Sequence, residues 1–177
     1  MPGAAEVGCA TSNDHKFEEA SYVLKDFAIS VSRLSTKGSE LQSSEPSEIA
    51  AFAASQAFRS FRRPLIVEDT GFFIQSLQGF PATYASYAFR TIGIDGILRL
   101  LQGANKRDAE FLSAVSYCEG PAAPITFTGR LKGKIALRPS GEHGFGFDPI
   151  FVPTGERRTL AEMSLAQKCV LSHRALA

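Results

Sequence analysis

The chain of 177 residues contains no tryptophan, only two methionines and only three cysteines. The cysteines (Cys9, Cys118 and Cys169) lie far apart and form no C-x-x-C pair. An odd number of widely separated cysteines argues against a disulfide scaffold and against a cysteine-based zinc site. We therefore expect a protein of the reducing cytoplasm.

Long apolar runs and an excess of charge are also missing. No stretch approaches the ~20 apolar residues of a membrane span, and the N-terminus lacks the basic and apolar regions of a signal peptide, so no membrane partner is expected. The chain has 19 Lys and Arg residues and 18 Asp and Glu residues, a net charge of +1. This balance argues against a nucleic-acid-binding module, which usually has a strongly basic face. It is compatible with a small anionic ligand held by a few cations.

What the sequence does have is the composition of a globular domain, with 44% hydrophobic and 21% charged residues. The length fits one domain over residues 1–177, or two lobes around one cleft. Strands are predicted around residues 1–8, 28–34, 65–67, 111–117, 125–129 and 150–152, and helices around 17–27, 46–61, 94–101, 160–167 and 172–177. Because strands and helices intermix throughout, we predict an α/β or mixed α+β fold.

A first candidate site lies at a predicted strand-to-helix junction, in the segment Thr11-Ser12-Asn13-Asp14-His15-Lys16. The first N–H groups and the positive end of a helix dipole favour an anion, and Lys16 adds a full charge. A simpler interpretation is an ordinary helix N-cap followed by a solvated lysine. The segment is not a Walker A loop, because the required glycine pattern is absent.

A second candidate follows a short apolar run, at Glu68-Asp69-Thr70-Gly71. Adjacent carboxylates at the end of a buried strand are costly unless positive charge lies nearby. Neighbouring side chains of a strand point to opposite faces, so we expect only one of the two to face a cleft. A carboxylate there is a suitable ligand for Mg²⁺, and a second could come from Glu40, Glu45 or Glu48; a solvated turn is the alternative.

Two further segments carry aromatic and cationic groups. In Gly144-Phe145-Gly146-Phe147-Asp148-Pro149 a ring can stack on a base and the aspartate can accept hydrogen bonds from it, although the same residues suit a turn with two core phenylalanines. Near the C-terminus, Lys168 and Ser172-His173-Arg174 can together bind a phosphate or a carbonyl, or form an ordinary surface pair.

Taken in order, these segments resemble the inosine triphosphate pyrophosphatase (Ham1-like) family, and most closely its archaeal branch. The matching residues are Ala10-Thr11-Ser12-Asn13 with Lys16, Glu68-Asp69-Thr70-Gly71-Phe72, Gly79-Phe80-Pro81, Phe127-x-Gly129, Gly144-Phe145-Gly146-Phe147-Asp148-Pro149-Ile150-Phe151, Ala161-Glu162-Met163, and Lys168 with Ser172-His173-Arg174. Each motif is weak alone, but the ordered combination spans nearly the whole chain and is specific.

The resemblance implies hydrolysis of ITP, dITP and XTP to the monophosphate and pyrophosphate by a Mg²⁺-dependent enzyme, usually a homodimer. It also implies a long twisted mixed sheet flanked by helices, in two lobes around a central nucleotide cleft. For the phosphates it implies Thr11, Ser12, Asn13, Lys16 and Thr70, with Lys16 also catalytic, and it adds Asp14 and His15 as further substrate-binding residues. For the metal it implies Glu40 and Asp69, with Asp69 also catalytic as a proton acceptor. For the base it implies Phe145, Gly146, Phe147 and Asp148, with Phe147 stacking, and for the 6-oxo edge of the base Lys168, His173 and Arg174.

The chain departs from the family at several positions. Ser12 stands where the family has glycine, Ser55 stands where it has a phosphate-binding lysine, and residues 81–85 differ from its usual sequence. The resemblance also implies a longer C-terminal helix, so we expect a clipped C-terminus. Ser55 and the short C-terminus leave open a catalytically weakened nucleotide-binding protein as an alternative. A second alternative is a Maf-like pyrophosphatase of modified nucleotides on a similar scaffold, although Ser172-His173-Arg174 argues against it.

Overall fold

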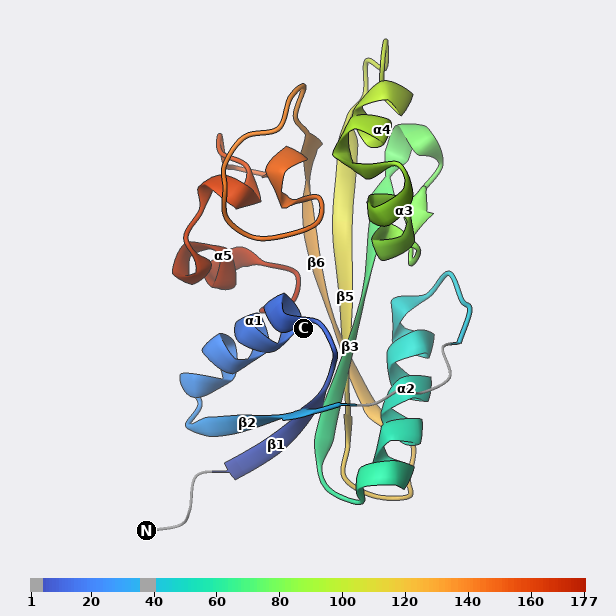
Figure 1. Cartoon of the computed structure of the whole chain (residues 1–177), viewed down its shortest axis with the longest axis vertical. Helices are drawn as coiled ribbons and strands as arrows, with labels where there is room; N and C mark the ends of the chain where they lie inside the picture. The colour runs from blue at the N-terminus through green and yellow to red at the C-terminus, as the bar shows by residue number, and fades with distance from the viewer. Residues whose placement is uncertain (1–4, 36–40) are drawn as a thin grey trace.

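The computed structural model describes residues 5–35 and 41–177, which fold as a mixed sheet with helices on its faces (Figure 1). The strands are β1 (Ala5–Ala10), β2 (Ile29–Leu34), β3 (Leu65–Ile74), β4 (Pro81–Ala82), β5 (Asp108–Cys118), β6 (Ile125–Ile135) and β7 (Phe151–Pro153). The helices are α1 (Asp14–Lys25), α2 (Pro46–Phe61), α3 (Ala85–Thr91), α4 (Gly93–Leu100) and α5 (Leu165–Leu171). The predicted mixed α/β class is confirmed.

The sheet has the strand order β2-β1-β3-β5-β6-β7, with β4 paired to part of β3. β1 is parallel to β2 and β3, whereas β3, β5, β6 and β7 pair antiparallel to one another in that order. The three longest strands, β3, β5 and β6, run through the centre of the molecule (Figure 1). They therefore connect the end that carries β1, β2 and α1 with the end that carries α3 and α4.

Two hydrophobic clusters lie along these strands. One gathers Leu65, Val67 and Cys118 under α2, and the other contains Phe72 and Phe111 with residues of α4 and of the chain after β6. Aromatic rings stack in the second cluster, with the Phe72 and Phe111 centroids 4.4 Å apart. Residues 68–71 of β3 lie between the two clusters, beside the pocket that is described in the next subsection.

Local signals in the sequence explain where the helices begin. Asn13 is the N-cap of α1, since its side chain accepts a hydrogen bond from the Lys16 amide. Pro46 opens α2 at a position where no backbone donor is needed.

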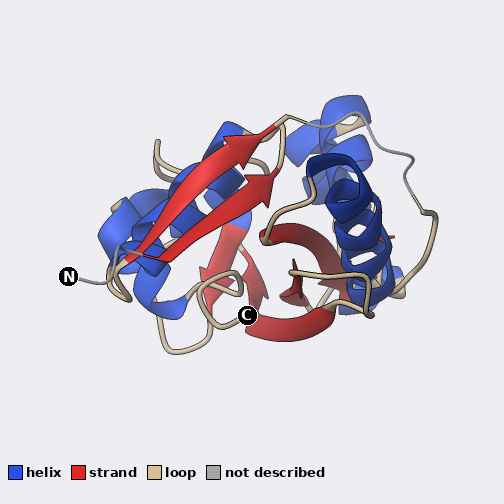
Figure 2. Cartoon of the chain, turned by 90° about the horizontal axis from the view of Figure 1, so that it is seen from below, coloured by secondary structure: helices blue, strands red, loops and turns tan. Residues whose placement is uncertain are grey.

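Helices lie on both sides of the curved sheet when it is viewed from below (Figure 2). No helix in the described part of the chain is long and apolar enough to cross a membrane.

The structure corrects several of the predicted elements. Glu68–Gly71 lie inside β3 and not after the end of a strand, and the helix predicted over residues 160–167 is a 3-10 turn (Leu160–Glu162) followed by α5. Residues 172–177 form a turn and not a helix. The last hydrogen bond of α5 runs from the Ser172 amide to the Lys168 carbonyl, and the backbone at Ser172 is extended. Helix α3, which was not predicted, follows directly after β4 and precedes α4. The candidate metal ligand Glu40 lies outside the described residues.

Candidate active site

A pocket of about 400 Å³ opens between the start of α1, the middle of β3, α3 and the loop before β7. Its lining contains most of the residues that the sequence singled out, from all four segments: Asn13, His15, Lys16, Asp69, Thr70, Phe145, Gly146, Phe147, Asp148, Lys168, His173 and Arg174. Thr83, Ala85, Ser86, Phe89 and Phe111 complete it. Four segments that are remote in the sequence therefore meet at one cavity.

The junction between β1 and α1 forms the wall near Lys16. The Asn13 amide donates to Thr11 Oγ1 at 3.1 Å and the Lys16 amide donates to Asn13 Oδ1 at 3.1 Å, so both polar side chains fix the loop. Thr11 and Ser12 are absent from the described lining of this pocket, and Asp14 instead forms an ion pair with Arg33 at the surface. Lys16, in the first turn of α1, is the part of the segment that brings full positive charge to the cavity.

Glu68 and Asp69 lie on opposite sides of β3, as strand geometry requires. Asp69 lines the pocket. The Glu68 side chain, only 8% exposed, pairs with Lys16 Nζ at 2.8 Å and with an Arg174 nitrogen at 3.2 Å. Burial disfavours its charge, but Arg174 and Lys16 outweigh burial and hold the pKa of Glu68 well below its usual range. Glu68 is therefore a buried anion that positions two cations.

Hydroxyl groups complete the surroundings of the Glu68 carboxylate. Ser113 on β5 donates to its Oε1 at 2.5 Å, and Thr70 donates to the same oxygen. An Arg174 nitrogen also lies 3.4 Å from Thr70 Oγ1. A buried carboxylate with this many donors is stable as an anion.

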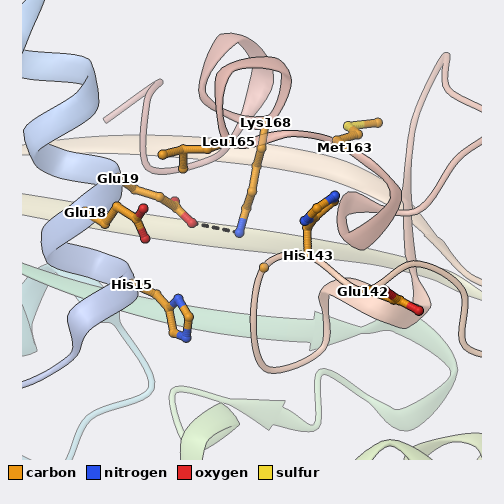
Figure 3. Close-up of a pocket in the computed structure, with 9 residues that line it drawn as sticks. His15, Glu18, Glu19, Glu142, His143, Met163, Leu165 and Lys168 are labelled. Carbon is orange, nitrogen blue, oxygen red and sulfur yellow. Dashed lines mark ion pairs between the residues drawn. The ribbon is translucent and has the colours of Figure 1, made fainter.

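Glu19 on α1 extends the network of charges toward the end of the pocket where Phe145 lies. Its residue is 3% exposed, and its two oxygens contact different cations, Lys168 at 2.7 Å and Arg174. Figure 3 shows Lys168 and Glu19 pointing toward each other across a neighbouring pocket of about 320 Å³, which shares His15 and Lys168 with the candidate site. Lys168 and Arg174 are thus held side by side by one carboxylate.

Asp148 closes the network on the other side of Lys168. Its Oδ2 lies 2.6 Å from Lys168 Nζ and accepts a hydrogen bond from the Phe145 amide at 2.9 Å. Burial raises the pKa of Asp148 above its usual value, although Lys168 opposes the shift. A side chain at residue 144 would overlap the same carboxylate oxygen, and Gly144 has a φ of +72° that favours glycine. The glycines of this loop therefore allow the backbone to wrap around Asp148.

The aromatic residues of the pocket have different surroundings. The Phe145 ring stacks on His15, with centroids 4.8 Å apart, and Lys168 Nζ lies 4.8 Å from the Phe145 centroid. Phe147, in contrast, is 3% exposed and stacks on Phe72 in the core. Phe147 therefore has little free surface for stacking, whereas Phe145 lies among the polar groups of the pocket.

His173 is a neutral residue in the pocket wall. Burial, followed by the charge of Arg174, lowers its pKa well below the usual value. Its ring stacks on Phe111 with centroids 4.7 Å apart, and its Nδ1 has no hydrogen-bond partner among the described residues. A buried imidazole nitrogen of this kind is costly unless a ligand or water bonds to it.

Sequence reasoning did not find Glu19, Thr83 or Phe89. No clear signal in the sequence indicates Glu19, because it does not lie on the apolar face that Phe17, Ala20 and Leu24 form. Its partners lie in a segment that only the tertiary fold brings to α1. Thr83 and Phe89 lie in and beside α3, a helix for which the sequence shows no clear periodicity.

A mixed sheet with a lysine at a helix N-terminus, and with buried cations and aromatic rings at the other end of one pocket, defines an α/β protein of the nucleotide-binding class. The chain belongs to the Ham1 family, whose family model matches residues 7–177. This match confirms the family that the sequence motifs indicated.

Individual relatives agree with this assignment. The chain is 50% identical to a dITP/XTP pyrophosphatase of Methanopyrus kandleri over 93% of this chain and 88% of the relative, and 46% identical to one of Saccharolobus solfataricus over 97% and 89%. The solved structure of a HAM1 protein from Coxiella burnetii is 28% identical and covers 97% of this chain and 93% of its own, with a TM-score of 0.79.

Proposed function

We propose that the protein hydrolyses ITP, dITP and XTP to the nucleoside monophosphate and pyrophosphate, and so removes deaminated purines from the nucleotide pool. The observation that carries this proposal is the buried pair of cations, Lys168 and Arg174, held by Glu19 at the end of the pocket where Phe145 lies. Relatives named dITP/XTP pyrophosphatase support the reaction.

The cations and His173 give a physical basis for reading the base. Hypoxanthine and xanthine carry a carbonyl at position 6, where adenine carries an amino group. The carboxylates do not hold every donor, since Arg174 Nε is buried without a hydrogen-bond partner among the described residues. Such a donor can bond to the carbonyl but not to the amino group, and leaving it unpaired costs about 1–3 kcal/mol. Discrimination by one to two orders of magnitude against ATP follows from one or two such contacts.

The opposite end of the pocket suits the phosphates. Lys16 lies in the first turn of α1, where the helix dipole adds to its charge, and Thr70 contributes a hydroxyl on β3. We assign phosphate binding to this end, with the loop of Thr11, Ser12 and Asn13 holding the helix start in place. Ser55, where the family has a lysine, donates to the Ala51 carbonyl within α2 and supplies no charge.

We propose that the site binds Mg²⁺, which uses one or two carboxylates together with phosphate oxygens and water. Among the described residues no group of three or more histidine, cysteine or acidic side chains could hold a metal ion alone, so phosphate oxygens would supply further ligands. Asp69 would be one ligand, with Glu40 as the second candidate. When bound, the ion supplies charge neutralisation and a more acidic water. Asp69 then also orients the attacking water, while Lys16 stabilises the departing pyrophosphate.

The proposal also includes the cellular location of the protein, which is the cytoplasm. The buried cysteines Cys9, Cys118 and Cys169, which form no disulfide, suit the cytoplasm.

We also propose a homodimer, supported by the exposed aromatic side chains Tyr84 and Tyr87, which are 49% and 62% exposed at α3. Light scattering after size-exclusion chromatography measures the mass in solution, and a monomer at micromolar concentration would remove this part of the proposal.

The activity itself is tested with a panel of nucleotides. The protein is incubated with Mg²⁺ and ITP, dITP, XTP, GTP, ATP or a pyrimidine triphosphate, and pyrophosphate and orthophosphate are measured separately. We expect pyrophosphate from the 6-oxo purines ITP, dITP and XTP at far higher rates than from ATP. Orthophosphate as the product, or equal rates on ATP, refutes the proposal. Tight ITP binding without turnover would instead identify a weakened nucleotide-binding protein, and a preference for modified pyrimidines would identify a Maf-like activity.

A further inference from the structure

We propose that Gly129 on β6 is a positioning residue for base recognition, because its missing side chain fixes where the C-terminal turn (residues 172–176) carries His173 and Arg174. The inference rests on the proposed function, since its readout is discrimination between purines. Gly129 itself contacts no pocket atom through a side chain, so its role is indirect.

Gly129 occupies the inner face of β6 directly beside the site. From residue 129 onward, buried and exposed positions alternate along β6, with Gly129, Leu131, Gly133 and Ile135 on the buried side. Gly129 is opposite Ser113 on β5, the residue whose hydroxyl donates to Glu68. The strand therefore passes next to the place where Glu68 contacts Arg174.

The C-terminal turn packs directly against the β6 backbone at this position. A Cβ placed ideally on residue 129 would lie 2.1 Å from the carbonyl oxygen of His173, 2.4 Å from the amide nitrogen of Ala177 and 2.6 Å from the carbonyl carbon of Leu176. All three are backbone atoms, which cannot rotate away as a side chain can. Any larger residue at this position must therefore displace the turn or the strand.

The turn has little freedom to absorb such a displacement without moving the pocket groups. Ser172 is fully buried; its carbonyl accepts a hydrogen bond from the Leu176 amide at 3.1 Å and its Oγ accepts one from the Ala175 amide at 3.2 Å. The intervening residues, His173 and Arg174, are the ones that reach Phe111 and the two glutamates. Displacing the turn therefore displaces both side chains together.

Backbone conformation does not explain a glycine at residue 129. Its φ is not in the left-handed region, which the structure reserves for other glycines such as Gly144 and Gly146. Within a strand, glycine lowers stability and leaves a gap in packing, so an uncommitted position would favour a larger residue. Close approach of the C-terminal turn is the remaining physical reason.

The test compares Gly129→Ala with a control on the same face of the same strand. At Gly133 a Cβ would lie 2.3 Å from the Val152 carbonyl oxygen and 2.6 Å from the Phe151 ring, so the substitution also forces a displacement, but of β7 in place of the turn. We measure kcat/KM for ITP and ATP in the wild type, G129A and G133A, and thermal unfolding in each. The ratio of the two kcat/KM values is expected to fall roughly tenfold or more in G129A, because small displacements of positioned groups are costly. In G133A the unfolding temperature falls while the ratio stays near that of the wild type.

The outcomes separate the two proposals. A wild type that does not prefer ITP refutes the proposed function. A wild type that does, together with an unchanged ratio in G129A or an equal loss in G133A, refutes the role of Gly129. If G129A does not fold, Ser172→Ala decides instead, since it loosens the same turn by removing the hydrogen bond to Ala175; a severalfold lower ratio supports the inference and an unchanged ratio overturns it.

Discussion

Replacing Glu68 with glutamine tests whether the buried charge network stabilises the protein. The substitution keeps the size of the side chain but leaves Lys16 and Arg174 without one of their counter-charges. Breaking a buried ion pair from one side typically costs about 3–5 kcal/mol. Because glutamine can still bond to Ser113 and Thr70, we expect a loss near the lower limit, about 3 kcal/mol.

Urea denaturation measures this loss directly. With an m-value of ~2 kcal/mol per molar for a domain of this size, a loss of ~3 kcal/mol lowers the unfolding midpoint by about 1.5 M. Glu110→Gln is the matched control, because Glu110 forms a 2.6 Å ion pair with Arg130 in which the Arg130 side chain is 51% exposed and the Glu110 side chain 25% exposed. Such surface pairs contribute only about 0.2–1 kcal/mol. A loss in E68Q no larger than that in E110Q would refute the argument that the network is stabilising.

The same residue predicts a dependence of stability on pH. The pKa of Glu68 is lowered in the folded protein, so its contribution is complete above the unfolded-state pKa of about 4.3 and is lost as the pH falls below it. The free energy of unfolding of the wild type should therefore decrease more steeply on acidification below about pH 4.3 than that of E68Q. Parallel profiles for the two proteins, measured by urea denaturation from pH 3 to pH 7, would contradict a lowered pKa.

The remaining predictions concern activity. Asp69→Asn is expected to reduce kcat more than about a hundredfold while leaving thermal unfolding nearly unchanged; retained turnover would remove Asp69 from the mechanism. EDTA should abolish pyrophosphate release and added Mg²⁺ should restore it, whereas full activity in EDTA would refute a metal requirement. Phe145→Ala is expected to raise KM roughly tenfold for ITP and ATP alike, because stacking contributes about 1–3 kcal/mol and is indifferent to the 6-position; a change confined to ITP would assign Phe145 a different role.

Much of the fold could be predicted because local chemistry determines it. Asn13 caps α1 and Pro46 opens α2, and both signals act over a few residues. The four candidate segments converge on one pocket, as their order along the chain indicated. In each of these cases the necessary interaction lies within the segment or is carried by the family motifs.

What could not be predicted depends on packing between remote segments. Strand geometry required Glu68 and Asp69 to separate, but only the fold shows that Glu68 is a buried counter-ion. Phe147 packs against Phe72 in the core, and that contact exists only once β3 and the loop before β7 are adjacent. Residues 172–177 have apolar spacing compatible with a helix, yet the bonds from Ser172 and the contact with β6 select a turn.

The ion pair between Glu19 and Arg174 joins residues 155 positions apart. During synthesis the first helix therefore carries its glutamate long before the cation that neutralises it has been made. A chain truncated before Lys168 lacks both cations that contact the Glu19 carboxylate. We expect such a truncated chain to be less stable, which favours its removal by proteases.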